Sequence, residues 1–216
     1  MREANLELRL LGGLDVRRGG KSLPLPPSRK TRALLAYLAL TGRAHRRDAL
    51  CNLLWDVTDD PRGALRWSLS KLRKQVDDEQ VARLTTDGET VELSLGGVCI
   101  DALDMRRELG GGKLDNAPTE VIEAWCARCT GEVLEGLDLP DFDTYQAWLI
   151  AEREQTRRLH ASALQALVAR HERSPERALS PAAAWVAIDP LNIHARLAAM
   201  RLALSLGQVD EAKRQL

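Results

Sequence analysis

The feature that most constrains the fold of this sequence is the order in which strand-like and helix-like hydrophobic patterns follow one another within its first 97 residues. From Asn5 to Val16 the apolar residues alternate around Gly12-Gly13, which is the pattern of paired strands, and residues 21–25 add a short third strand. Three helical patterns follow, and two runs rich in β-forming residues then meet at Asp87-Gly88, a strong hairpin signal. Strands, three helices and a β-hairpin in this order predict a winged helix-turn-helix fold.

Local signals mark the ends of these three helices. Ser28 is a predicted N-cap for a first helix that stops at Gly42. A second, short helix is expected over residues 46–55. Pro61 stands where a proline would begin the third helix, which runs to about Val76.

After residue 97 the pattern is helical only. Expected helices cover residues 102–109, 119–129, 142–171, 181–188, 193–206 and a last stretch from 209. Small residues at the interfaces of the helix pair around Asp189-Pro190 are typical of tetratricopeptide-type repeats. We therefore expect an α+β domain over residues 1–97 and an all-α domain over 98–216. Because the sequence stops at Leu216 inside an apparent helix, we also expect a fragment of a longer protein.

The net charge of zero, from 31 basic and 31 acidic side chains, hides an asymmetry. Residues 1–100 hold 17 basic and 13 acidic side chains, whereas residues 101–216 hold 14 and 18. A basic first half favours a polyanionic partner. The longest uncharged apolar run, residues 33–40, is too short to span a bilayer, and no signal peptide opens the chain, so a cytoplasmic protein is expected.

The third helix combines an apolar stripe with a basic face. Leu65, Leu69, Leu72 and Val76 share one side, and no acidic residue occurs between Arg62 and Gln75. Such a helix can read base edges with arginine and contact phosphates with lysine, although an ordinary solvated face would have the same pattern. The predicted DNA-contacting residues are Arg66, Trp67, Ser70, Lys71 and Lys74, with Arg62 and Arg73 nearer the edge of the apolar stripe.

Weaker DNA-binding candidates lie outside the third helix. Two pairs of cations begin the first and second helices, where backbone N–H groups favour a phosphate: Arg29 and Lys30, and Arg46 and Arg47. In the hairpin, Arg83, Thr85 and Thr86 are candidates for backbone or minor-groove contact, although the acids beside them, Asp87, Glu89 and Glu92, would repel phosphate.

No catalytic, metal or cofactor site is predicted. Cys126 and Cys129 form a lone CxxC motif without further ligands, and burial explains these thiols better than metal or redox chemistry. The glycines of residues 110–112 are expected to form a linker, and Arg153, Arg157 and Arg158 a solvated helix face. A packing seam between the short helices and the long one is expected from Trp125, Leu134, Leu137, Leu139, Phe142, Tyr145 and Trp148.

Several segments resemble a known family. LRLLGGLDVRRGGKSLPL, SRKTRALLAYLAL, RRDALCNLLW and RGALRWSLSKLRK resemble the OmpR-like winged helix of SARP-type bacterial transcriptional regulators. GLDLPDFDTYQAWLIAEREQTRRLHASAL and AIDPLNIHARLAAMRLALSLGQVDEA resemble the bacterial transcriptional activator domain that follows it in that family. Many members carry a polar residue in place of Gly63 and a smaller polar residue near Trp67, so base preferences do not transfer.

The resemblance implies a regulator, most simply an activator, that binds double-stranded promoter DNA and contacts RNA polymerase. It further implies pairs of protomers on direct repeats. The loop that contacts polymerase in OmpR-like proteins corresponds to Trp55, Asp56, Asp59 and Asp60, although Trp55 is also a natural core residue and the acids also terminate a helix. The alternative hypothesis is a helical interaction or sensor module without DNA binding, and an enzyme using the paired cysteines is the weakest hypothesis.

Overall fold

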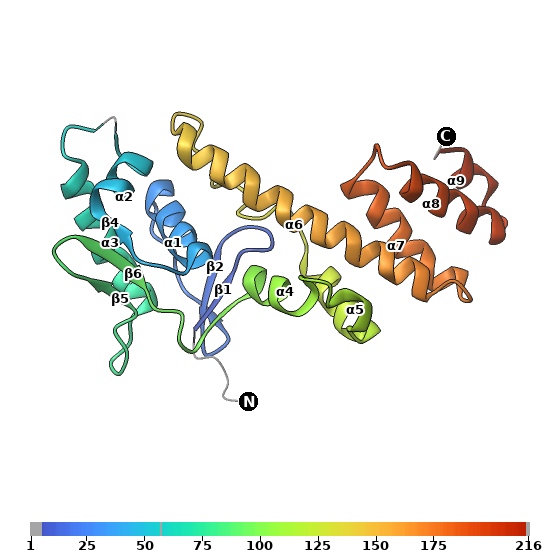
Figure 1. Ribbon diagram of the computed structural model, residues 1–216, viewed down its shortest axis with the longest axis horizontal. Coiled ribbons are helices and arrows are strands. Elements are labelled where there is room, and N and C mark those ends of the chain that lie inside the picture. Colours follow the sequence, from blue (N-terminus) through green and yellow to red (C-terminus); the bar gives the residue numbers. More distant parts are fainter. Residues whose placement is uncertain (1–5, 57, 215–216) are drawn as a thin grey trace. The chain divides into compact units, whose positions relative to one another are not determined.

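The computed structural model describes residues 6–56 and 58–214. It contains small sheets followed by helices, as the sequence predicts (Figure 1). The strands are β1 (Leu6–Arg9), β2 (Asp15–Arg18), β3 (Lys21–Ser22), β4 (His45–Arg46), β5 (Leu84–Thr86), β6 (Thr90–Leu93) and β7 (Val98–Ile100). The helices are α1 (Arg29–Thr41), α2 (Arg47–Leu54), α3 (Pro61–Val76), α4 (Asp101–Leu109), α5 (Thr119–Arg128), α6 (Asp143–Arg170), α7 (Pro175–Ile188), α8 (Ile193–Ser205) and α9 (Val209–Arg214), with a 3₁₀ turn at Leu114–Asn116. Asn5, where the first predicted strand begins, lies outside the described residues.

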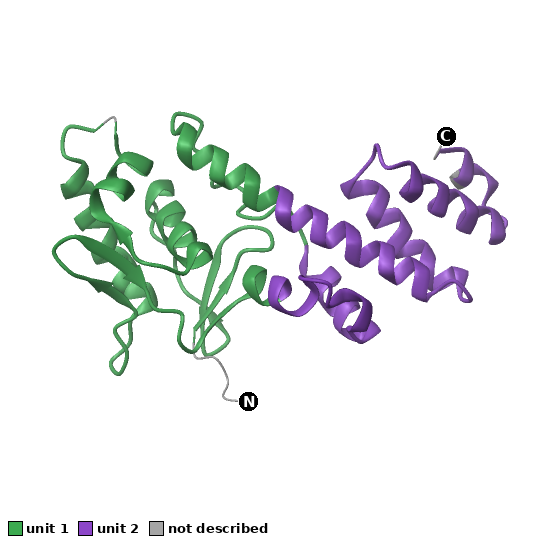
Figure 2. Ribbon diagram, viewed as in Figure 1, with its two compact units in different colours: residues 1–104, 130–153 green, residues 105–129, 154–216 purple. Residues whose placement is uncertain are grey.

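The chain forms two compact units that are not consecutive stretches of sequence (Figure 2). Unit 1 comprises residues 1–104 and 130–153, and unit 2 comprises residues 105–129 and 154–216. The long helix α6 contributes its first part to unit 1 and the remainder to unit 2. The expected packing seam is accordingly divided: Trp125 belongs to unit 2 and its six expected partners to unit 1.

Two sheets frame the helices of unit 1. The first has the order β3-β2-β1-β7, with β7 parallel to β1, and the second has the order β4-β6-β5. The hairpin of β5 and β6 confirms the prediction at Asp87-Gly88, whereas the short strands β4 and β7 were not predicted.

Helix α1 begins and ends, and α3 begins, where the sequence predicts. The Ser28 side chain accepts a hydrogen bond from the backbone N–H of Thr31, and Gly42 ends α1 in the left-handed conformation at φ 58°. Pro61 begins α3, and the Asp60 carboxylate accepts from the backbone N–H of Gly63 at 2.7 Å.

Arg153 of α6, which was expected to face solvent, binds the segment of residues 130–142 within unit 1. The Arg153 side chain is only 13% exposed; its guanidinium donates to both carboxylate oxygens of Asp138, at 2.8 and 3.0 Å, and to the carbonyl of Val133 at 3.0 Å. Backbone bonds from Leu134 N–H to the Leu10 carbonyl and from Glu135 N–H to the Gly12 carbonyl then join this segment to the turn after β1. The prediction that Arg153 lies on a solvated face is therefore wrong.

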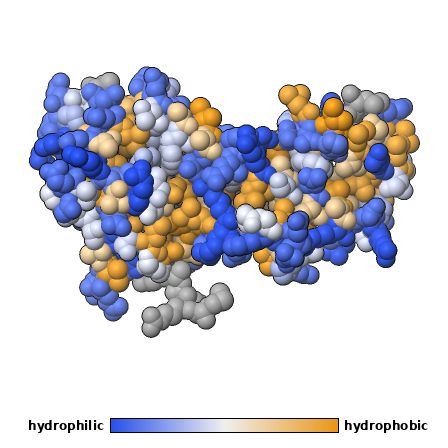
Figure 3. Space-filling model, in the orientation of Figure 1, coloured by the Kyte–Doolittle hydropathy of each residue, from blue (hydrophilic) through white to orange (hydrophobic). Residues whose placement is uncertain are grey.

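Unit 2 is a set of helices whose interfaces use small side chains. Ala195, Ala199 and Ala203 of α8 are buried, and α8 packs against both α7 and α9. Hydrophobic side chains are nevertheless visible at the surface over α8 and over the turns at its two ends (Figure 3). Within the part of the chain that the structure describes, every helix is too short or too polar to cross a membrane.

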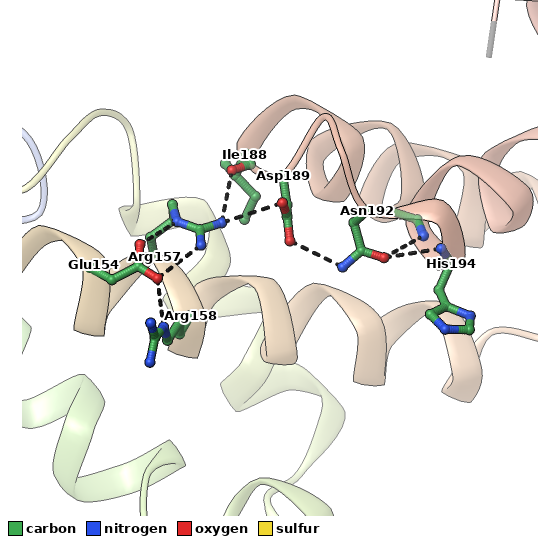
Figure 4. Close-up of polar contacts among 8 residues, drawn as sticks. Glu154, Arg157, Arg158, Ile188, Asp189, Asn192 and His194 are labelled. Carbon is green, nitrogen blue, oxygen red and sulfur yellow. Dashed lines mark hydrogen bonds and ion pairs between the residues drawn. The ribbon is translucent and has the colours of Figure 1, made fainter. Parts of the chain in front are cut away.

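Arg157 links α6 to the end of α7 (Figure 4). Its guanidinium donates to Glu154 at 2.7 Å and to the carbonyl of Ile188 at 3.3 Å, and it lies 3.7 Å from Asp189. Glu154 also accepts from Arg158, and the hydrogen bonds from the two arginines lower the pKa of Glu154 to about 2. Of the three arginines expected on a solvated face, only Arg158 is largely exposed.

The contact between Asp138 and Arg153 predicts a pH dependence of stability. The hydrogen bonds from Arg153 lower the pKa of Asp138 from 3.8 to about 2, so this carboxylate stabilises the fold above pH 4 and loses its contribution as the pH falls from about 4 to 2. Asp138→Asn should therefore reduce the midpoint of urea unfolding at pH 7 and match the unchanged protein at pH 2. In an Arg153→Ala background the same substitution should have no pH-dependent effect. An unaltered pH profile in Asp138→Asn would contradict this role.

Candidate nucleic-acid interface

The orientation of α3 is determined by its buried side. Leu65, Leu69, Leu72 and Val76 are buried, as the sequence predicts. Ser68 is also buried, and its hydroxyl lies 2.9 Å from that of Thr31 on α1, which fixes the rotation of α3. The opposite side of the helix consequently faces solvent.

The exposed side of α3 carries the residues predicted to contact DNA. Arg66, Ser70 and Lys74 are exposed, Trp67 has 48% of its surface exposed, and Lys71 is half-buried. The Lys71 ammonium lies 5.2 Å from the centroid of the Trp67 ring, within the range of a cation–π contact. Trp67 is thus a surface residue beside a cation.

Arg62 and Arg73, the two arginines beside the apolar stripe of α3, both contact side chains of unit 1. Arg62 donates to Asp48 of α2 at 2.8 Å, and this hydrogen bond lowers the pKa of Asp48. Arg73 donates to the hydroxyl of Thr86 on β5 at 2.9 Å. Arg73 therefore connects α3 to the hairpin, while Arg62 remains 72% exposed beside its acidic partner.

The start of α2 lies next to the hairpin turn. Arg46 is 3.8 Å from Glu89, and Arg47 donates to the carbonyl of Asp87 at 3.3 Å. Thr85 of the hairpin is exposed. A shallow depression of about 180 Å³ lies between α2, α3 and this turn, lined by Arg47, Asp48, Arg62, Leu65, Arg66, Gly88 and Glu89.

Arg83 does not lie where a DNA contact requires it. It is 4% exposed, and its guanidinium donates to the carbonyl of Val76 at 2.9 Å and to Asp78 at 2.7 Å. Arg18 of β2 similarly donates to the carbonyls of Gln75 and Asp77. Both arginines satisfy carbonyl groups at the C-terminal end of α3, where the helix dipole favours cations, so Arg83 has a positioning role.

The cations at the start of α1 are engaged by residues 138–142. Lys30 lies 4.0 Å from the centroid of the Phe142 ring, and Arg29 donates to the carbonyl of Asp138 at 3.3 Å. Burial lowers the pKa of Lys30, although Asp56 and Asp141 oppose the shift. We therefore omit Arg29 and Lys30 from the candidate interface.

The acidic loop between α2 and α3 divides into a core residue and surface acids. Trp55 is 5% exposed, so its side chain belongs to the core. Asp56, Asp59 and Asp60 are exposed, and Asp60 also caps α3. Of the four residues predicted to contact polymerase, only the three acids are accessible.

Cys126 is a poor candidate for thiolate chemistry. Burial raises the pKa of Cys126 to about 12, which disfavours the thiolate that nucleophilic or metal chemistry needs. Among the described residues, no three or more His, Cys, Asp and Glu side chains gather where they could hold a metal ion.

Comparison with known proteins supports the fold. No protein-family model and no curated protein sequence matches the chain. Among solved structures, Mycobacterium tuberculosis EmbR in complex with a low-affinity phosphopeptide is similar over 98% of this chain, with a TM-score of 0.70 and 20% sequence identity. The chain spans 57% of the length of that EmbR chain. The winged helix followed by a helical domain is thus a shared fold.

The buried position of Arg83 predicts that its loss affects stability. Arg83→Ala removes two hydrogen bonds at the end of α3, and thermal unfolding should shift down by roughly 4–10 °C. Arg66→Ala removes an arginine whose side chain is 70% exposed and should leave the melting temperature within about 1 °C. Equal melting temperatures for the two variants would contradict the positioning role of Arg83.

Proposed function

We propose that the protein is a DNA-binding transcriptional regulator of the SARP type, with residues 1–97 as its winged-helix domain and 98–216 as an activator domain. The observation that carries this proposal is the exposed side of α3, which presents cations and no acid between Arg62 and Gln75. The fold shared with EmbR supports the proposal, because it is the fold that the family resemblance implies.

In this function, α3 lies in the major groove of double-stranded promoter DNA. Arg66 suits bidentate contact with guanine, whereas Lys71 and Lys74 suit phosphates. Trp67 would pack on sugar or a thymine methyl group, and Arg47 would approach the backbone from the start of α2. The exposed acids Asp56, Asp59 and Asp60 are the proposed contact with RNA polymerase. From the family resemblance we further propose protomer pairs on direct repeats.

Selection of bound sequences from random duplex DNA identifies the operator and tests DNA binding. On the selected duplex, Arg66→Ala/Lys74→Ala should weaken binding at least tenfold in fluorescence anisotropy. The slope of log affinity against log salt should also become shallower by about 1, because the phosphate contact proposed for Lys74 is lost.

Arg173→Ala/Lys213→Ala is the matched control, because it removes two exposed cations from unit 2. If both double variants weaken binding equally, the effect is one of net charge, and the assignment of α3 is overturned. If the unchanged protein binds no DNA even at low salt, the alternative hypothesis of a helical interaction module replaces this proposal.

The ion pair between Arg62 and Asp48 predicts a gain of affinity. Asp48→Asn removes a negative charge beside Arg62, so the arginine becomes available to phosphate, and DNA affinity should rise roughly two- to fivefold at low salt. Glu172→Gln, an exposed acid in unit 2, should change affinity much less. Unchanged or weaker binding of Asp48→Asn would exclude Arg62 from the interface.

A further inference from the structure

Helix α8 has two apolar sides, and only one of them is covered. Its alanines, Ala195, Ala199 and Ala203, are buried. Ile193, Leu197 and Leu204 are 69%, 38% and 52% exposed, and together with Met200 they occupy positions i, i+4, i+7 and i+11. At 100° per residue these four side chains lie within about 60° of one another on the outer side of the helix.

Exposed apolar residues also occur next to both ends of α8. Leu191 in the turn before the helix is 90% exposed, and Val209 at the start of α9 is 51% exposed. Five of the eight large hydrophobic residues that are exposed among the described residues therefore lie within residues 191–209. Scattered apolar residues need no explanation, but a concentration of this kind on one side of a helix is typical of an interaction surface. We call the row of Leu191, Ile193, Leu197, Met200 and Leu204 the α8 ridge.

The charged side chains of α8 itself are both arginines. Arg196 lies on one side of the ridge around the helix, and Arg201 lies on the other. No Asp or Glu occurs from residue 193 to residue 205. A partner that covers the ridge would therefore gain from acidic residues along both its edges.

We propose that the α8 ridge docks an amphipathic helix of another protein, with leucine-like side chains on one face and Asp or Glu along the edges of that face. Such a helix would present apolar residues at the spacing of the ridge and pair its acids with Arg196 and Arg201. A second copy of this chain fits less well, because antiparallel pairing of α8 with itself would place the two Arg196 side chains along one edge of the interface and the two Arg201 side chains along the other. The proposal is independent of DNA binding.

Two synthetic helical peptides test the preference for acidic edges. Both carry leucine at i, i+4, i+7 and i+11; one has Glu and the other Lys at every flanking position. We expect the Glu peptide to bind the full 216-residue chain at least tenfold more tightly in fluorescence anisotropy, and we expect this preference to shrink at high salt. In Arg196→Glu/Arg201→Glu the preference should invert. Equal affinity for both peptides would overturn the proposal.

The double variant Ile193→Asp/Leu204→Gln tests whether the peptide binds at the α8 ridge. Both residues are more than half exposed, and the helix dipole stabilises an Asp in the first turn of a helix. The variant should therefore keep its circular dichroism spectrum and melting temperature. It should lose at least tenfold in affinity for the Glu peptide. Ile150→Asp, at an isoleucine of unit 1 that is also more than half exposed, is the matched control and should bind normally.

Two results would reject the ridge as a docking site for another protein. Equal loss of binding in the Ile150→Asp control would show that the peptide adheres to any apolar surface. A dimer in sedimentation that Ile193→Asp/Leu204→Gln converts to monomer would assign the ridge to a second copy of the chain.

Discussion

Helix α1 has side chains buried in every direction around its axis, including Leu34, Leu35, Leu38 and Ala36. A helix that is apolar all round must be enclosed by other elements, and α1 packs against α2, α3 and β6. Tyr37 at its remaining side contacts Trp148 of α6, with ring centroids 4.8 Å apart. The enclosure of α1 therefore sets the position of α3 and explains why the first part of α6 belongs to unit 1.

This arrangement divides the cations of unit 1 into two groups with different tasks. Arg18, Arg83 and Arg153 turn inward, where they donate hydrogen bonds to backbone carbonyls or to a carboxylate. Arg66 and Lys74 point away from the core because their neighbours on α3 are fixed in it. The inward arginines connect α3 and the loops to neighbouring elements. The outward cations lie at the surface, where Arg66 is 4.0 Å from the exposed Asp60.

The sequence predicts the order of elements well because the signals are local. The cap at Ser28, the proline at position 61 and the turn at Asp87-Gly88 each act within a few residues, and each forms as expected. The exposed side of α3 follows from the same short-range periodicity. The roles of Arg83 and Arg153 were not predictable. The sequence around an arginine does not show whether its guanidinium will be hydrated or will bind a carbonyl far away in the sequence. The contact of Lys30 with Phe142 was not predictable for the same reason, because the two residues lie 112 positions apart in the sequence.

The two proposed surfaces differ in the kind of partner that their chemistry selects. Cations on α3 surround one exposed tryptophan, so most of the binding energy would come from electrostatic attraction, which is sensitive to salt and suited to a polyanion. On α8 the cations only border an apolar row, so burial of that row would supply affinity and the charges would supply orientation. Because the first surface belongs to unit 1 and the second to unit 2, a substitution that abolishes one interaction leaves the residues of the other intact. Under the two proposals, one unit would hold DNA and the other would recruit a protein.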